Sequence, residues 1–222
     1  MIAFDLNYMI TVLPILIKAL KVTLSIALIS LVISLILSLV LALITYNKIK
    51  ILNIVCKVYI SFFRGTPALA QLFLLYFGIF QIIPIFKSID AYTAIIIALS
   101  LNSSAYMAET MRGAIESVDK RQMEACLSIG MTNMQAMRRV ILPQAARVAI
   151  PSLSNSFVDL IKGSSLAFTI GVPEIMATAN FEGAATYKFF EVFVAVVIIY
   201  WIITIVFGFL QKKLEIKLSK AY

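Results

Sequence analysis

The chain has 222 residues, of which 62% are hydrophobic and only 14% charged, and its mean hydropathy is +1.00. Because about a quarter of the residues in soluble domains are charged, this composition excludes a soluble globular protein and indicates an integral membrane protein. The net charge of +8 is carried mostly in loops, so we expect contact with membrane lipid and none with nucleic acid. The two cysteines, Cys56 and Cys126, make no disulfide framework, and without histidine we expect no metal site.

Apolar runs long enough to cross a membrane follow one another along the chain. The first residues include Asp5 and no early Lys or Arg, which argues against a cleavable signal peptide, so we expect the first span to be retained. The segment before Lys21 is expected to lie at the membrane interface. Since a span needs about 20 residues, we predict an all-α membrane protein of about five helices forming a single domain over residues 1–222. The predicted spans are 22–45, 59–83, 92–111, 150–170 and 190–210, with a cytoplasmic loop at about 112–149.

The distribution of Lys and Arg predicts how the spans are oriented. Fourteen of these residues fall on one side of the predicted membrane and four on the other, while Lys162 lies inside a span. Cytoplasmic loops carry an excess of Lys and Arg, so we predict an N-terminus outside the cell and a cytoplasmic C-terminus. The four on the outer side are Lys18, Lys21, Lys87 and Lys188.

A break is predicted within the second span, at 64–67. Thr66 followed by Pro67 is typical of a helix start, because the Thr oxygen can accept from an early backbone N–H and Pro needs no partner in the first turn. We therefore expect the span to kink or restart here. An ordinary kink without functional meaning would have the same sequence.

Two polar stripes run along the third and fourth predicted spans. Placing Asp or Lys near the centre of a membrane helix costs about 2.5–3.5 kcal/mol each, so these side chains should face a bundle interior or a water-filled path. A substrate with both ammonium and carboxylate groups would find partners there. Alternatively, Asp159 and Lys162 only neutralise each other, while the Asn and Ser side chains only join helices by hydrogen bonds. The stripes are Asn102, Tyr106, Glu109 and Gly113, then Ser152, Asn155, Ser156, Asp159 and Lys162.

The 112–149 loop contains two amphipathic pieces. Residues 124–129 predict a short helix that stops at Gly130, and residues 133–147 predict a second helix broken at Pro143. The small residues Ala125 and Gly130 would let a partner protein approach closely. Helices lying on the membrane surface would give a similar pattern.

This loop resembles the EAA loop of the permeases of ATP-binding-cassette (ABC) importers. The resemblance rests on Glu124-Ala125-Cys126, then Gly130, then Val140-Ile141-Leu142-Pro143, where Cys126 replaces the third alanine and Val140 the usual isoleucine. It implies a type I importer permease whose loop forms a coupling helix that docks into an ATP-hydrolysing subunit. The docking residues it implies are Glu124, Ala125, Gly130, Met131, Leu142 and Pro143.

Other segments are similar to the polar amino-acid uptake branch of that family. These are the Arg64-Gly65-Thr66-Pro67 segment, the stretch from Leu101 to Tyr106 and the Leu142-Pro143-Gln144-Ala145 segment. Residues 154–157 and 162–167 look most like permeases for cystine or related sulfur amino acids, which makes L-cystine a candidate substrate. The substrate-path residues expected from the stripes and this resemblance are Asn102, Ser103, Tyr106, Asn155, Ser156, Asp159, Lys162 and Gly163.

The chain contains no GxxxxGK[ST] phosphate-binding loop, so we expect no ATP hydrolysis and no cofactor in this chain. The resemblance implies that ATP and Mg²⁺ act on separate ATPase subunits, that a second permease chain completes the pathway, and that an extracytoplasmic binding protein delivers the amino acid. Transport would proceed by alternating access. Two other classes remain open from the sequence: an ion-coupled secondary amino-acid transporter using Asp159 or Glu109, and a membrane scaffold without transport activity.

Overall fold

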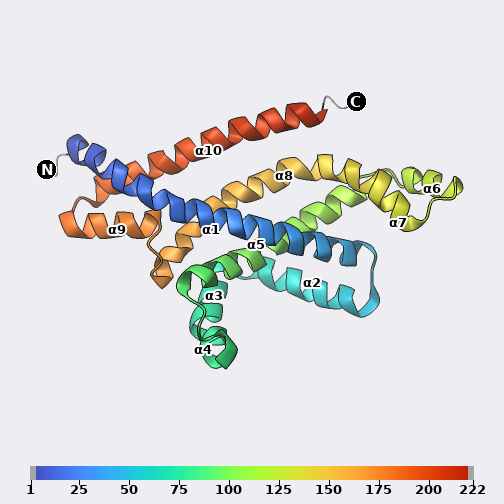
Figure 1. Ribbon diagram of the computed structural model, residues 1–222, viewed down its shortest axis with the longest axis horizontal. Coiled ribbons are helices and arrows are strands. Elements are labelled where there is room, and N and C mark those ends of the chain that lie inside the picture. The colour runs from blue at the N-terminus through green and yellow to red at the C-terminus, as the bar shows by residue number, and fades with distance from the viewer. Residues whose placement is uncertain (1–3, 220–222) are drawn as a thin grey trace. The chain divides into compact units, whose positions relative to one another are not determined.

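The computed structural model describes residues 4–219, and all regular structure in that part of the chain is helical (Figure 1). This confirms the predicted all-α class. The helices form two compact units. One contains the chain up to Leu31, Pro67–Ser100 and Phe157–Leu210, and the other contains Val32–Thr66, Leu101–Ser156 and the chain from Gln211. The four long helices α1, α5, α8 and α10 contribute residues to both units.

The first helix is longer than the sequence predicted. Helix α1 runs without interruption over Leu6–Tyr46, so the predicted start at residue 22 is wrong and the expected span is only its later part. Its 41 residues correspond to about 60 Å, roughly twice the thickness of the hydrocarbon core. Pro14 does not stop the helix. Val12 and Leu16, on either side of it, are buried at 1% and 0% exposure against α9 and α10, and this packing offsets the missing hydrogen bond.

The predicted break in the second span is confirmed. Helix α2, Lys50–Gly65, ends before an extended pair of residues, and α3, Ala68–Phe73, begins after it. The expected role of Thr66 as N-cap is wrong, because Pro67 occupies the N-cap position of α3 and the Thr66 hydroxyl donates back to the carbonyl of Phe62 (2.8 Å). The path continues through the π-helix η1, Leu74–Ile79, then α4, Phe80–Ile82, and a 3-10 turn η2, Pro84–Phe86.

The remaining long helices agree with the predicted positions but not with every boundary. Helix α5 covers Ala91–Glu116, and α10 covers Phe189–Ser219. The predicted span 150–170 is divided between α8, Leu142–Gly163, and a 3-10 segment η4, Ser164–Ile170. A short helix α9, Ile175–Thr186, which the hydropathy did not predict, precedes α10.

In the part of the chain that the structure describes, fewer than five helices are apolar enough to count as spans. Within residues 4–219 three helices qualify by length and composition: Leu6–Tyr46, Ala91–Glu116 and Phe189–Lys213. The broken pair Lys50–Gly65 and Ala68–Ile82 adds a fourth if it is counted as one span. Helix α8 does not qualify, because its polar stripe lowers the hydropathy of a helix that is otherwise long enough.

The loop after α5 is almost entirely helical. Helix α6 covers Lys120–Ser128, α7 covers Asn133–Ala136, and a π-helix η3, Met137–Ile141, leads directly into α8. The predicted break at Pro143 is wrong. In the wider π turn the N–H of Leu142 donates to the carbonyl of Met137, five residues back, and the side-chain amide of Gln144 donates to the carbonyl of Val140 (3.1 Å), so the helix continues through the proline.

Candidate functional site

The loop helix α6 starts with a charged cap. The carboxylate of Asp119 accepts from the backbone N–H of Arg121 (2.9 Å) and pairs with its guanidinium (2.6 Å). Hydrogen bonding to this guanidinium holds the pKa of Asp119 below its ordinary value, so the cap stays charged at neutral pH. The helix therefore begins at Lys120, earlier than the predicted Glu124, because a cap residue was available just before it.

The end of α6 is a tight glycine turn, as predicted. Gly130 has a φ of +84° and donates to the carbonyl of Leu127 (3.0 Å), and the next N–H, of Met131, donates to the carbonyl of Cys126 (3.1 Å). This pair of bonds is the Schellman motif, which needs a residue in the left-handed region and strongly favours glycine. A capping box of Thr132 with Gln135 then starts α7 at once.

The tip between α6 and α7 presents an exposed apolar surface. Ile129 and Met134 are 79% and 74% exposed, and three of the predicted docking residues, Glu124, Ala125 and Gly130, are exposed beside them. Such side chains are costly to leave in water, so the tip has the character of a contact surface for another protein. We name the segment 124–134 the docking tip.

The other docking candidates have different environments. Met131 is half-buried, Leu142 packs against the buried cluster of Met137 and Ile141, and Pro143 is exposed farther along the chain. Cys126, which stands where the family has its third alanine, is buried at 6% exposure. Cys126 therefore lies on the inner side of the docking tip, and Leu142 belongs to the packing at the start of α8.

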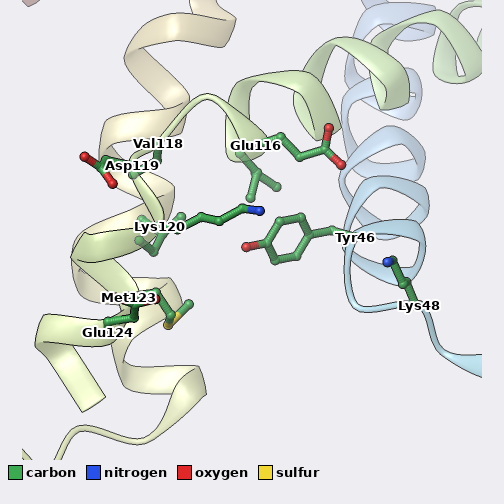
Figure 2. A pocket seen from close by; sticks show the side chains of 10 residues that line it. Tyr46, Lys48, Glu116, Val118, Asp119, Lys120, Met123 and Glu124 are labelled. Carbon is green, nitrogen blue, oxygen red and sulfur yellow. The ribbon is translucent and has the colours of Figure 1, made fainter. Parts of the chain in front are cut away.

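A cleft of about 590 Å³ lies between α6 and the ends of α1 and α5 (Figure 2). Lys120 reaches from α6 into this cleft, and its amine and the hydroxyl of Tyr46 point toward one another. Glu116, at the end of α5, and Glu124 also line it. The cleft thus brings charged groups from the end of a membrane helix close to the start of the docking tip.

The polar stripe on α5 binds the broken end of α2. The side-chain amide of Asn102 donates to the carbonyl of Phe63 (3.1 Å), and the hydroxyl of Tyr106 donates to the carbonyl of Arg64 (3.4 Å). Carbonyls at a helix end have no partner within the helix, so these two side chains supply hydrogen-bond donors to two carbonyls at the break. Asn102 and Tyr106 therefore join α5 to the end of α2, and the neighbouring Ser103 is half-buried.

A run of charges follows along the same helix. Glu109 accepts two hydrogen bonds from Arg112 (3.2 and 2.9 Å) and lies 3.8 Å from the guanidinium of Arg64. Arg112 also pairs with Glu116 at 2.7 Å. The i, i+3 and i, i+7 spacing of Glu109, Arg112 and Glu116 was readable in the sequence, but the contribution of Arg64 from another helix was not.

The stripe on α8 remains open in this single chain. Asp159 and Lys162 are 4.0 Å apart, and their side chains are 78% and 59% exposed, so the pair is loose. Asn155 is exposed, and the Ser156 hydroxyl donates to the carbonyl of Ser152 within the helix (3.3 Å). Of the predicted path residues, Asn102, Ser103, Tyr106, Asn155 and Ser156 belong to one unit, and Asp159, Lys162 and Gly163 to the other.

One buried carboxyl escaped the sequence analysis. Glu174 is fully buried and caps α9, accepting from the backbone N–H of Ala177 (2.9 Å) and from the hydroxyl of Thr23 on α1 (3.4 Å). Glu is not a usual N-cap residue, so the sequence carried little signal for this role. Its contacts join α9 to α1.

Comparisons with known proteins agree with this geometry. Residues 34–220 match the family described as "Binding-protein-dependent transport system inner membrane component". The probable amino-acid ABC transporter permease PatM of Vibrio harveyi is 55% identical, with 99% of this chain and 98% of PatM covered. The probable amino-acid permease YxeN of Bacillus subtilis is 49% identical, with 98% and 97% covered.

More distant relatives include a named cystine permease and a solved structure. The L-cystine transport system permease TcyB of Bacillus subtilis is 42% identical, with 78% of this chain and 74% of TcyB covered. A crystal structure of an amino acid ABC transporter with histidines contains a chain that is 36% identical, with 97% of this chain and 100% of that chain covered and a TM-score of 0.89.

Proposed function

Because this chain belongs to the family of binding-protein-dependent inner membrane components and is a non-catalytic amino-acid ABC transporter permease, we propose that it moves polar amino acids into the cell by alternating access. ATP and Mg²⁺ would act on separate ATPase subunits, and a binding protein would deliver the substrate from outside. The N-terminus lies outside and the C-terminus in the cytoplasm in this proposal, which rests on the excess of Lys and Arg in the loops on one side.

The docking tip carries the coupling part of the proposal. Its two helices are joined by a hydrogen-bonded glycine turn, and Ile129 and Met134 stand exposed at its end. A compact apolar tip on a long helical loop suits insertion into a cleft of an ATPase subunit, where its burial would drive association. Movement of that subunit would then be passed to α5 and α8, between which the loop is held.

The open stripe on α8 supports a charged substrate and a second permease chain. Asp159 and Lys162 offer one charge of each sign, which suits the ammonium and carboxylate groups of an amino acid. Their exposure in one chain would be costly at membrane depth, so a water-filled path bounded by a second permease chain, either a copy or a sister subunit, should cover them. L-Cystine is the first candidate substrate, because the segments 154–157 and 162–167 resemble cystine permeases and TcyB is a relative named for it.

Reconstitution tests the proposal. The chain would be purified from its native membrane in mild detergent, its ATPase partner identified, and the complex placed in liposomes with purified binding protein. We expect ATP-driven uptake of L-cystine or of one member of a panel of cationic, acidic and uncharged polar amino acids. Uptake driven by an ion gradient in the absence of the ATPase would instead support the ion-coupled alternative, which the family membership does not favour.

Two variants separate docking from substrate binding. Gly130→Asp places a charge on the docking tip at a position where Asp tolerates a positive φ, so uptake should be abolished while membrane insertion is retained. Lys162→Ala should weaken uptake but leave the ATPase bound, and loss of assembly in this variant would support a purely structural role for the pair. Gly208→Ala, on α10 where an added Cβ meets nothing within 4 Å, is the matched control.

A further inference from the structure

We propose that Arg64, Glu109, Arg112 and Glu116 act together, as an ion chain, to position the broken end of α2 relative to the start of α6. Glu109, Arg112 and Glu116 follow one another along α5, Arg64 joins them from the last turn of α2, and the four side chains connect pairwise at 3.8, 2.9 and 2.7 Å. This inference rests on the proposed function, because it assigns the ion chain a part in coupling ATP hydrolysis to transport.

The first end of the ion chain lies at the break after α2. Arg64 is in the last turn of α2, its guanidinium faces Glu109, and it stands 5.6 Å from the centre of the Tyr106 ring. The backbone here is also held to α5, because Asn102 and Tyr106 donate to the carbonyls of Phe63 and Arg64. The position of the break relative to α5 is therefore fixed by both backbone and charge contacts.

The second end of the ion chain lies at the cleft beside the docking tip. Glu116 is the last residue of α5, lines this cleft and pairs with Arg112 one turn earlier. Lys120, in the first turn of α6, extends into the same cleft (Figure 2). The end of the ion chain and the start of α6 thus line one cleft.

Charge balance makes the four side chains act as a unit. Two cations and two anions alternate, so each inner charge has an opposite neighbour on both sides. Their side chains are 28–53% exposed, so they are only partly screened by water. Because these side chains are partly exposed, each pair alone stabilises little, and removing one inner charge leaves both of its neighbours without one opposite partner. The loss of one inner charge is therefore felt at two contacts of the ion chain.

The test compares uptake per ATP hydrolysed in the reconstituted complex. Arg64→Gln and Glu109→Gln should each lower this ratio, by about fivefold if the ion chain carries a typical coupling energy, while the complex still assembles. The double variant should be no worse than the poorer single variant, because both remove the same contact. Arg112→Lys keeps the charge but loses the forked hydrogen bonds and should give an intermediate ratio. Lys57→Gln removes an exposed cation from α2 and is the matched control.

The outcomes distinguish a role of the ion chain in coupling from a purely structural role. Multiplying effects in the double variant, or an unchanged ratio in Glu109→Gln, would overturn the inference. If the thermal midpoint of Glu109→Gln were also lower, the ion chain would be a purely structural feature. An equal loss in Lys57→Gln would overturn it as well, since the loss would then reflect charge alone. Failure of the unmodified complex to show ATP-driven uptake would instead refute the proposed function on which the inference rests.

Discussion

Replacing Gly130 by alanine isolates the backbone requirement of the docking tip. An added Cβ would meet nothing within 4 Å, so no clash contributes, and the cost comes from holding an alanine at a φ of +84°. That cost is about 1–2 kcal/mol for a non-glycine residue in the left-handed region. Asparagine tolerates this region better, so Gly130→Asn should destabilise the turn clearly less than Gly130→Ala does.

Hydrogen exchange measured on peptides covering 124–136 reads this cost directly. The N–H groups of Gly130 and Met131 close the turn, so weakening it by about 1–2 kcal/mol should increase their opening about 5- to 30-fold. The complex with the ATPase should lose affinity in the same order, with alanine worse than asparagine. Equal exchange in the wild-type, alanine and asparagine forms would refute the reasoning, because the turn would then not depend on the left-handed residue.

Three further predictions concern other parts of the chain. Gly183→Ala places a Cβ 2.6 Å from the ring of Phe189, so the ring must move, and the free energy of unfolding should fall by about 1–3 kcal/mol, as is typical of overpacking. Thermal unfolding in detergent should show this as a lower midpoint, whereas Gly208→Ala should leave the midpoint unchanged. Glu174→Ala removes the cap of α9 and should lower the free energy of unfolding by about 0.5–2 kcal/mol, which the same thermal measurement detects. Glu174→Gln should be milder because its amide oxygen still accepts a hydrogen bond, and equal midpoints for the two variants would contradict the capping role. The pKa of Asp119 is lowered, so its cap is complete above the ordinary Asp pKa and is lost as the pH falls through the lowered value. Exchange protection at the start of α6 should therefore be constant from neutral pH down to about pH 5 and decrease only below it. Asp119→Asn should abolish this decrease.

Local signals in the sequence predicted local structure well. The apolar runs located the long helices, and the position of Gly130 predicted the end of α6, because a helix stop depends on residues within one turn. The break at 64–67 was also predictable from Pro67 and its neighbours. In each case the decisive interactions lie within a few residues along the chain.

Features that depend on distant residues were missed or misjudged. The start of α1 was predicted too late because the packing of Val12 and Leu16 on α9 and α10 carries the helix past Pro14. Pro143 was expected to break a helix that the π turn before it keeps continuous. Among the candidate path residues, Asn102 and Tyr106 were placed correctly on one face, but their partners, the carbonyls at the end of α2, lie about forty positions away and leave no local pattern.

The π turn η3 also makes the direction of the docking tip depend on residue count. A π turn holds one residue more than the α turn it replaces, and each residue turns an α-helix by about 100°. Deleting one residue from Met137–Ile141 would allow an ordinary α-helix but would aim α6 and α7 at a different side of α8. Related chains that differ here by a single insertion or deletion should therefore present their tips in different directions, and an alignment gap at this point would mark a change of partner geometry even where every docking residue is identical.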